Sequence, residues 1–364
     1  MHEVSFTTYN VLSPPLCTES HYPKCAPEAV AHENRLPKVM KRLADETAMG
    51  TVIGLQEVDL TWAGKLHTFF AERGYTVVFA QYGKPFNGYM GVMLAWPTDR
   101  YEVLDVEISR VSDTAPKGMW PKTEKGLPSM LSPFGYLSYN GLKEVLGCRP
   151  PELRQDPKPG EFEWKVAKDR FNEAVFVRLR PRTKNARSFV VGTYHMPCLF
   201  GPPEKVRVVN IHTYLLLSRL KTFAAGDPAV LMGDFNFKPG TSPYLLALSG
   251  GSFEAAAAAP GGAAELEGLQ QRLPPGPLWP DGLESAYHAF HKKEPLFTNF
   301  AQSEGMAEPF VETLDYIWFT PGALTLVDVP KLPQTKEEAK GPFPNAEEPS
   351  DHLPLRATMR LQGA

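Results

Sequence analysis

Cysteine is scarce in this sequence, and its spacing argues against two common ways of stabilising a fold. Cysteine occurs only four times in 364 residues, at positions 17, 25, 148 and 198. None of them belongs to a Cys-x-x-Cys pair, which argues against a structural zinc site. So low a density in a long chain also argues against a disulfide framework. An ordinary hydrophobic core must therefore hold the fold, and the chain is long enough to bury one.

Long apolar runs and an excess of positive charge are also missing. No stretch of about 18 apolar residues occurs, and the first residues lack the basic and apolar regions of a signal peptide. The formal net charge is −3, so any site for a polyanion must be local. We therefore expect an intracellular, cytoplasmic protein without membrane insertion, and leave a nuclear or organellar location open.

Proline, in contrast, is abundant, with 36 residues. Short apolar runs bounded by turn residues predict buried strands at residues 4–9, 52–55, 77–80, 92–96, 174–179, 189–194, 229–232, 314–319 and 355–361. Helical spacing predicts helices at residues 28–48, 203–225 and 242–248, with Pro37 starting or kinking the first. Three Pro-rich stretches, at 112–165, 250–282 and 330–349, are expected to be long loops. We expect one domain, residues 1–364, with these stretches as insertions.

Polar residues repeatedly stand at the ends of the predicted strands. They are Asn10, Glu57, His195, Asp234, Asn236, Asp315, Asp351 and His352. Each one taken alone has a simpler explanation as a turn residue, a helix cap or a structural histidine. Together, carboxylate and amide oxygens favour Mg²⁺, with Mn²⁺ as an alternative, and one or two ions are expected. Metal-assisted phosphoester hydrolysis needs such a set, with histidines to serve the phosphate and the water.

The order of these motifs resembles that of the endonuclease/exonuclease/phosphatase superfamily. The resemblance rests on Thr8-Tyr9-Asn10, Leu55-Gln56-Glu57-Val58, Tyr194-His195, Gly233-Asp234-Phe235-Asn236, Leu314-Asp315-Tyr316-Ile317 and Ser350-Asp351-His352. It implies an α+β, DNase I-like fold, a four-layer αββα sandwich of two mainly antiparallel sheets flanked by helices. The motif Thr298-Asn299-Phe300 points to the deadenylase, nocturnin and 2′-phosphodiesterase branch.

The resemblance also implies a role for each motif residue. Asn10 and Glu57 would hold a metal, while Asp234 and Asn236 would complete the metal site and orient the attacking water. His195 would stabilise the scissile phosphate. Asp315 would support the site, and Asp351 would hold the tautomer of His352. His352 itself is implied as a catalytic residue and metal ligand. Asn172 and Arg35 are implied as substrate-binding residues.

The substrate is the least determined part of the prediction. Residues 165–187 carry eight Lys or Arg against two acids, which suggests either a phosphate-binding patch or a solvated strand face. Aromatic residues could stack bases or anchor an insertion, namely Trp120, Phe134, Tyr136, Tyr139 and Trp164. Residues 84–89 and 192–198 depart from RNA-trimming relatives. The leading hypothesis is a 3′-to-5′ exoribonuclease acting on single-stranded RNA; the alternatives are a nucleotide phosphatase, a lipid phosphodiesterase and an inactive binding scaffold.

Overall fold

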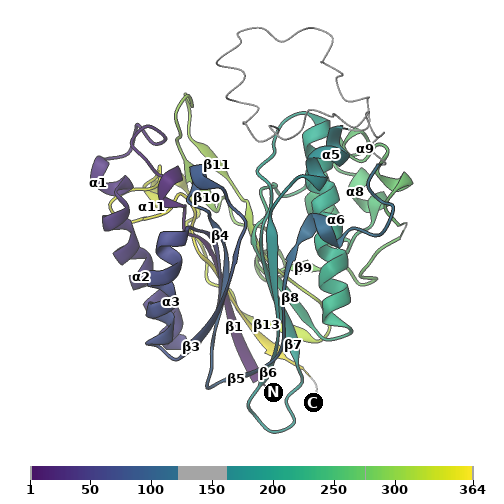
Figure 1. The fold of residues 1–364 in the computed structure, drawn as a ribbon, viewed down its shortest axis with the longest axis horizontal. Coiled ribbons are helices and arrows are strands. Elements are labelled where there is room, and N and C mark those ends of the chain that lie inside the picture. The colour runs from purple at the N-terminus through teal and green to yellow at the C-terminus, as the bar shows by residue number, and fades with distance from the viewer. Residues whose placement is uncertain (1, 122–161, 275, 363–364) are drawn as a thin grey trace, which may run out of the picture.

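The computed structural model describes residues 2–121, 162–274 and 276–362. Two six-stranded sheets face each other in it, with helices on both outer faces (Figure 1). The first sheet has the order β13 (Leu324–Asp328), β14 (Leu355–Leu361), β1 (His2–Asn10), β2 (Val52–Val58), β4 (Gly91–Pro97) and β3 (Tyr75–Gln81). The second has the order β5 (Tyr101–Arg110), β6 (Glu173–Pro181), β7 (Phe189–His195), β8 (Ala229–Asp234), β12 (Asp315–Phe319) and β9 (Glu284–Ser285).

The sheets are mainly antiparallel, but each contains one parallel pair. In the first sheet β1 runs parallel to β2, and in the second β7 runs parallel to β8. A short antiparallel pair, β10 (Asn299–Ala301) and β11 (Phe310–Glu312), stands apart from both. The predicted α+β sandwich of two mainly antiparallel sheets is therefore confirmed.

Three apolar clusters correspond to the layers of this sandwich. Strand β14 shows how a strand contributes to one of these clusters, because its residues alternate between buried and half-buried along the strand. Leu355, Ala357 and Met359 thereby enter the cluster that fills the space between the two sheets. A second cluster lies between the first sheet and its helices, and a third, which includes Trp164, lies between the second sheet and its helices.

Helices cover both outer faces. The first sheet carries α1 (Pro27–Val30), α2 (His32–Met49) and α3 (Leu60–Ala71). The second sheet carries α5 (Phe162–Lys168), α6 (Pro203–Ala224), α7 (Ser242–Leu248), α8 (Phe253–Ala257) and α9 (Gly262–Glu265). Two short helices, α10 (Ala286–His291) and α11 (Lys336–Ala339), lie outside these two helical layers. No helix among the described residues is long and apolar enough to cross a membrane.

Several local predictions need correction. Pro37 lies inside α2 and does not start it; the break falls between α1 and α2 instead. The stretch 250–282 is not a plain loop, because Phe253, Ala256 and Leu269 are buried in the helical layer. The stretch 330–349 likewise contains α11 and the fully buried Phe343. Of the aromatic residues proposed to stack bases, Phe134, Tyr136 and Tyr139 lie outside the described residues.

Candidate active site

The candidate site lies at the rim of the sandwich where β1, β2, β7 and β8 end. Parallel pairing aligns Asn10 with Gln56 and His195 with Asp234. Antiparallel pairing then sets Asp315, the first residue of β12, against Asp234. Strand register therefore gathers residues that are far apart in the sequence. Strand β1 begins and strand β14 ends at the opposite end of the sandwich (Figure 1).

The backbone of the rim adopts conformations that few residues tolerate. Gly233 has φ 155°, and a Cβ built there would lie 1.9 Å from the carbonyl oxygen of Tyr194. Only glycine therefore fits directly before Asp234. Glu57 and Asn236 have left-handed φ angles of 58° and 48°. Such strain in non-glycine residues is typical of functional sites.

Asn10 joins two carboxylates at the centre of the site. Its Nδ2 donates to Glu57 Oε1 and to Asp234 Oδ2, at 3.0 Å in each case. Its Oδ1 accepts from the backbone N–H of Leu12 at 2.9 Å, which fixes the direction of the amide. The backbone N–H of Ser13 donates to the second oxygen of Glu57 at 3.0 Å. Asn10 thus presents its amide nitrogen, not the oxygen of a metal ligand, to the two carboxylates.

Two histidines flank Asp234. His195 Nε2 lies 3.5 Å and His352 Nε2 lies 3.7 Å from its Oδ2. Burial raises the pKa of Asp234 to about 6, while the neighbouring histidines and the Asn10 amide oppose that rise. The backbone N–H of Asn236 donates to the other oxygen, Oδ1, at 3.0 Å. The Asn236 side chain donates to the carbonyl of Met196 at 2.9 Å.

The carboxylate partner of His352 differs from the predicted one. Its Nδ1 lies 2.7 Å from Asp315 Oδ2, which also accepts from the Thr298 hydroxyl at 2.6 Å. Asp351 instead accepts from Tyr22 and Asn299, at 2.9 and 3.2 Å. The role predicted for Asp351, holding the tautomer of His352, is therefore wrong. A residue next to His352 in the chain points away from the ring, whereas the paired strands β8 and β12 bring Asp315 beneath it.

The charge of His352 reflects these surroundings. Burial opposes the protonated imidazole, but the carboxylates of Asp315, Asp234 and Asp351 outweigh burial and raise the pKa of His352 well above its usual value. These carboxylates thus favour the protonated imidazole. Its Nε2 can donate to an anion that enters the site.

The structure places the two predicted substrate-binding residues differently. Asn172 is half-buried and donates from Nδ2 to the carbonyl of His195 at 2.8 Å. Arg35 is fully buried, and its guanidinium donates to the carbonyls of Val11, Leu12 and Pro349. These bonds connect the segment after β1 to the segment before Asp351. Because Arg35 lies inside the fold, its position does not support direct contact with a substrate.

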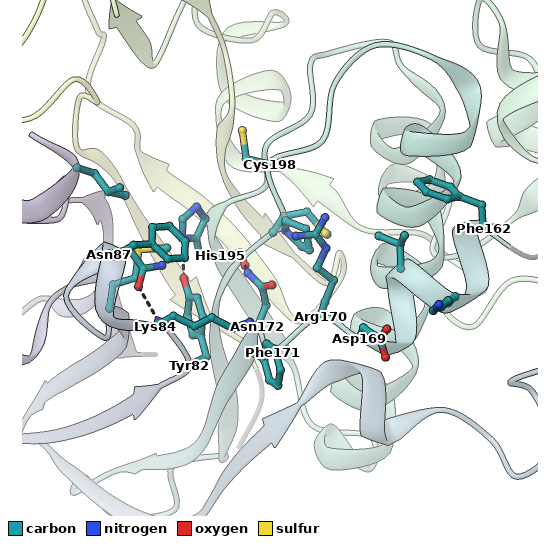
Figure 2. Close-up of a pocket in the computed structure, with 18 residues that line it drawn as sticks. Tyr82, Lys84, Asn87, Phe162, Asp169, Arg170, Phe171, Asn172, His195 and Cys198 are labelled. Atoms are coloured by element: carbon teal, nitrogen blue, oxygen red, sulfur yellow. Dashed lines mark hydrogen bonds between the residues drawn. The ribbon is translucent and has the colours of Figure 1, made fainter. Parts of the chain in front are cut away.

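A pocket of about 850 Å³ opens beside His195. Its walls come from both halves of the sandwich, with residues 82–90 on one side and α5 with the segment before β6 on the other (Figure 2). Lys84, Lys165 and Arg170 supply positive charge, and Asp169 is the acid in its lining. The side chain of Lys84 lies 4.7 Å from the ring centroid of Phe171, across the pocket.

The basic stretch 165–187 does not form one surface. Its first part, with Lys165 and Arg170, lines the pocket. Its second part belongs to β6 and the following turn, where Arg178 pairs with Asp227 and Arg180 pairs with Glu102. The second part therefore fits the strand-face explanation, and phosphate binding stays a prediction for the first part. Trp164 is buried, and its ring lies 6.3 Å from that of Trp120, which supports the anchoring role proposed for these two aromatic residues.

Sequence reasoning missed one side chain in contact with the site. The Tyr82 hydroxyl lies 2.7 Å from His195 Nδ1. Tyr82 follows β3 directly, so the rule that polar residues at strand ends form the site also applies to it. The predicted strand at 77–80 ended one residue before β3 does, at Gln81.

The donor set fits a divalent cation. Two groups of side chains each bring their ligand atoms within 4.8 Å of one another: Glu57, His195 and Asp234, and Asp234, Asp315 and His352. Asp234 belongs to both groups. Burial and the nearby charge of Asp315 both raise the pKa of Asp234, and a bound cation would oppose this rise.

The chain belongs to the Endonuclease/Exonuclease/phosphatase family, whose sequence profile matches residues 7–352. The predicted family and its enzyme class, the phosphoric ester hydrolases, are thereby confirmed. The chain is 25% identical to the CCR4-Not complex 3′-5′-exoribonuclease subunit Ccr4 of Emericella nidulans, over 99% of this chain and 52% of the fungal protein. It is 27% identical to nocturnin of Drosophila melanogaster, over 54% of this chain and 29% of that protein. The chain thus spans about half the length of the Ccr4 subunits that it matches.

Solved structures show the same fold. ANGEL2, described as a 2′,3′-cyclic phosphatase, matches with a TM-score of 0.66 at 18% identity, over 99% of this chain and 96% of that chain. The human nocturnin catalytic domain with bound sulfate matches with a TM-score of 0.58 at 17% identity, over 99% and 95%. These likenesses support the αββα architecture.

Proposed function

We propose that this chain is a Mg²⁺-dependent phosphodiesterase that removes nucleotides from the 3′ end of single-stranded RNA. One observation carries the proposal. The buried cluster of Glu57, Asn10 and Asp234, flanked by two histidines, lies next to a pocket lined by three cationic side chains. An anionic chain bound in that pocket would bring a phosphate to the carboxylate cluster.

Glu57 and Asp234 would hold one or two Mg²⁺ ions, for which Mn²⁺ could substitute. The bound cation supplies charge neutralisation at the phosphate and lowers the pKa of a coordinated water. Asn236 has its backbone N–H and its Nδ2 already bonded, which leaves the amide oxygen to accept from an attacking water. Asn10 holds the two carboxylates together from its nitrogen side, which differs from the predicted role as a ligand.

The two histidines have separate tasks in this proposal. Protonated His352 donates through Nε2 to the phosphate, while Asp315 keeps its Nδ1 bonded. His195, on the pocket side, donates through Nε2 to a second phosphate oxygen. Electrostatic contacts of this kind stabilise charge that develops in the transition state.

The pocket supports a nucleic acid over a compact ester. Lys84, Lys165 and Arg170 can pair with successive phosphates. Phe86 lines the same pocket with an exposed ring, which suits the stacking of an unpaired base. The similarity to fungal 3′-5′-exoribonuclease subunits supports RNA as the substrate and the direction of cleavage. An intracellular, cytoplasmic location stays a prediction from the sequence.

The test uses the purified chain with end-labelled oligo(A), mixed-sequence RNA, single-stranded DNA and RNA that ends in a 2′,3′-cyclic phosphate. With Mg²⁺ we expect a ladder of RNAs shortened from the 3′ end, and no products after chelation with EDTA. Asp234→Asn and Glu57→Gln should each lower turnover at least about 10³-fold, since each removes a charge from the metal site.

The matched control is Asp328→Asn, which removes one exposed carboxylate from β13, in a different part of the first sheet. It should keep full activity. Release of inorganic phosphate from the cyclic end without chain shortening would replace the proposal with a terminal phosphatase. Full activity of Asp234→Asn would refute the assigned site.

A further inference from the structure

The ring of His195 is held from both halves of the sandwich. His195 ends β7 in the second sheet, and Asn172 fixes its carbonyl by a 2.8 Å hydrogen bond. Tyr82 follows β3 in the first sheet, and its hydroxyl lies 2.7 Å from His195 Nδ1. Figure 2 shows the tyrosine and the histidine meeting at the edge of the pocket. The hydroxyl makes no other hydrogen bond to the described residues.

The opposite nitrogen of the ring faces negative charge. His195 Nε2 lies 3.5 Å from Asp234 Oδ2 and 3.9 Å from Glu57 Oε1. A lone pair at Nε2 would repel these oxygens, whereas an N–H is attracted to them. A neutral imidazole carries one proton, so a proton on Nε2 leaves Nδ1 as an acceptor.

Tyr82 is suited to donate to that acceptor. Burial raises the pKa of the Tyr82 hydroxyl well above its usual value, and the charge of Glu57 adds to the rise. The hydroxyl therefore keeps its proton at any pH at which the protein works. Its backbone is also anchored, because the N–H groups of Tyr82 and Gly83 both donate to the carbonyl of Met90.

We propose that Tyr82 is a positioning residue, which holds His195 in the tautomer protonated at Nε2 and directs that N–H toward the scissile phosphate. The proposal rests on the function proposed above. His195 could alternatively bind a metal through Nε2, and the two roles require different tautomers of the ring. In that alternative Nε2 carries no proton, and Nδ1 donates to the tyrosine.

The direct test is ¹⁵N NMR of the full chain labelled at histidine, with and without Mg²⁺. His195→Gln identifies the resonances by their loss among the nine histidines. We expect a protonated Nε2 and an unprotonated Nδ1 in the unmodified chain. Tyr82→Phe, which keeps the ring and removes the hydroxyl, should give a mixture of the two tautomers.

Kinetics provide the second readout. Tyr82→Phe should lower kcat about tenfold and change KM less than about twofold, because the lost hydroxyl acts through the histidine while the ring that lines the pocket is kept. The matched control is Tyr214→Phe, in which the lost hydroxyl donates to the carbonyl of Pro274 in the helical layer. It should leave kcat and the His195 resonances unchanged.

Two results would overturn the proposal. The first is a His195 ring protonated at Nδ1 in the unmodified chain. The second is a Tyr82→Phe variant with an unchanged tautomer and unchanged kcat. If the chain hydrolyses no nucleic acid, the proposed function fails, and the NMR measurement still decides whether Tyr82 sets the tautomer of His195.

Discussion

Two buried histidines in different regions of the molecule have opposite properties. His212 lies in α6 under the second sheet, where Nε2 is 2.9 Å from the carbonyl of Ala167 and Nδ1 is 3.0 Å from the Tyr194 hydroxyl. Burial lowers the pKa of His212 to about 4. At the rim, His352 is buried as well, at 4% exposure against 0% for His212, yet its pKa is raised well above the usual value.

The difference lies in the partners. His212 has a carbonyl and a hydroxyl, neither of which repays the cost of burying a charge. His352 has Asp315 in hydrogen-bond contact and Asp234 within 3.7 Å. Burial by itself thus produces a neutral structural histidine, and burial among carboxylates produces a cationic one. Nearby carboxylates therefore distinguish the histidine of the candidate site from the histidine of the core.

Among changes that test this comparison, removal of the carboxylate partner of His352 should have the largest effect. Asp315→Asn should lower kcat about 10²-fold, the usual scale for loss of one donor that stabilises charge in the transition state. Because Asp315 raises the pKa of His352, its loss lowers that pKa. Activity that needs the protonated ring should then be lost at lower pH, so the alkaline limb of the pH–rate profile moves down.

Asp351→Asn is the matched control for this prediction. Asp351 contributes charge but no hydrogen bond to His352, because it accepts from Tyr22 and Asn299. The alkaline limb of the pH–rate profile should move less in Asp351→Asn than in Asp315→Asn. The reverse order of the two shifts would show that Asp351 is the partner after all.

The second prediction concerns the neutral histidine of the core. The folded pKa of His212 is about 4, below the value of 6.5 expected for the unfolded chain. The unfolded chain therefore takes up this proton first, and stability falls as the pH drops from 6.5 to 4. The full contribution is about 3 kcal/mol.

Urea unfolding at several pH values can isolate this contribution. His212→Gln, which cannot titrate, should show a shallower loss of unfolding free energy between pH 6.5 and 4 than the unmodified chain. Equal slopes would mean that His212 is protonated in the folded state, and the contrast with His352 would disappear.

The smallest effect distinguishes two arginines of the basic stretch. Arg170 lines the pocket, whereas Arg178 pairs with Asp227 and bonds the carbonyl of Ala224. Arg170→Ala should raise KM for RNA several-fold, roughly 1 kcal/mol of binding, and weaken the salt dependence of KM. Arg178→Ala should leave KM unchanged and lower the melting temperature. An equal rise of KM in both variants would place the substrate on the whole stretch.

Nine of the fourteen strands in the described residues could be predicted from the sequence, whereas β5, β9, β10, β11 and β13 could not. Strands such as β8 and β14 are short apolar or alternating runs, which identify themselves locally. Strand β5 is an edge strand, in which Val103, Leu104, Val106 and Ile108 are exposed among charged neighbours. Its pattern is neither a buried run nor a clean alternation, so only its pairing with β6 makes it a strand.

The residues of the site could be predicted more fully than their contacts. Every motif residue from Asn10 to His352 lies at the rim, because strand ends place them there. The sequence did not show which side chains are hydrogen-bond partners. Asp315, and not Asp351, holds His352, and Arg35 supports the backbone. The correct partner is 37 residues from His352, while the wrong one is its neighbour in the chain.

The sequence by itself determined the positions of nine strands along the chain, the family and the types of residue at the site. These depend on hydrophobic patterning and short motifs, which are local properties of the chain. The tertiary structure alone decided the partnerships, such as Asn10 with Asp234 across 224 residues and Tyr82 with His195 across 113. Hydrogen-bond partners depend on the register and facing of distant strands, and no local pattern records that geometry.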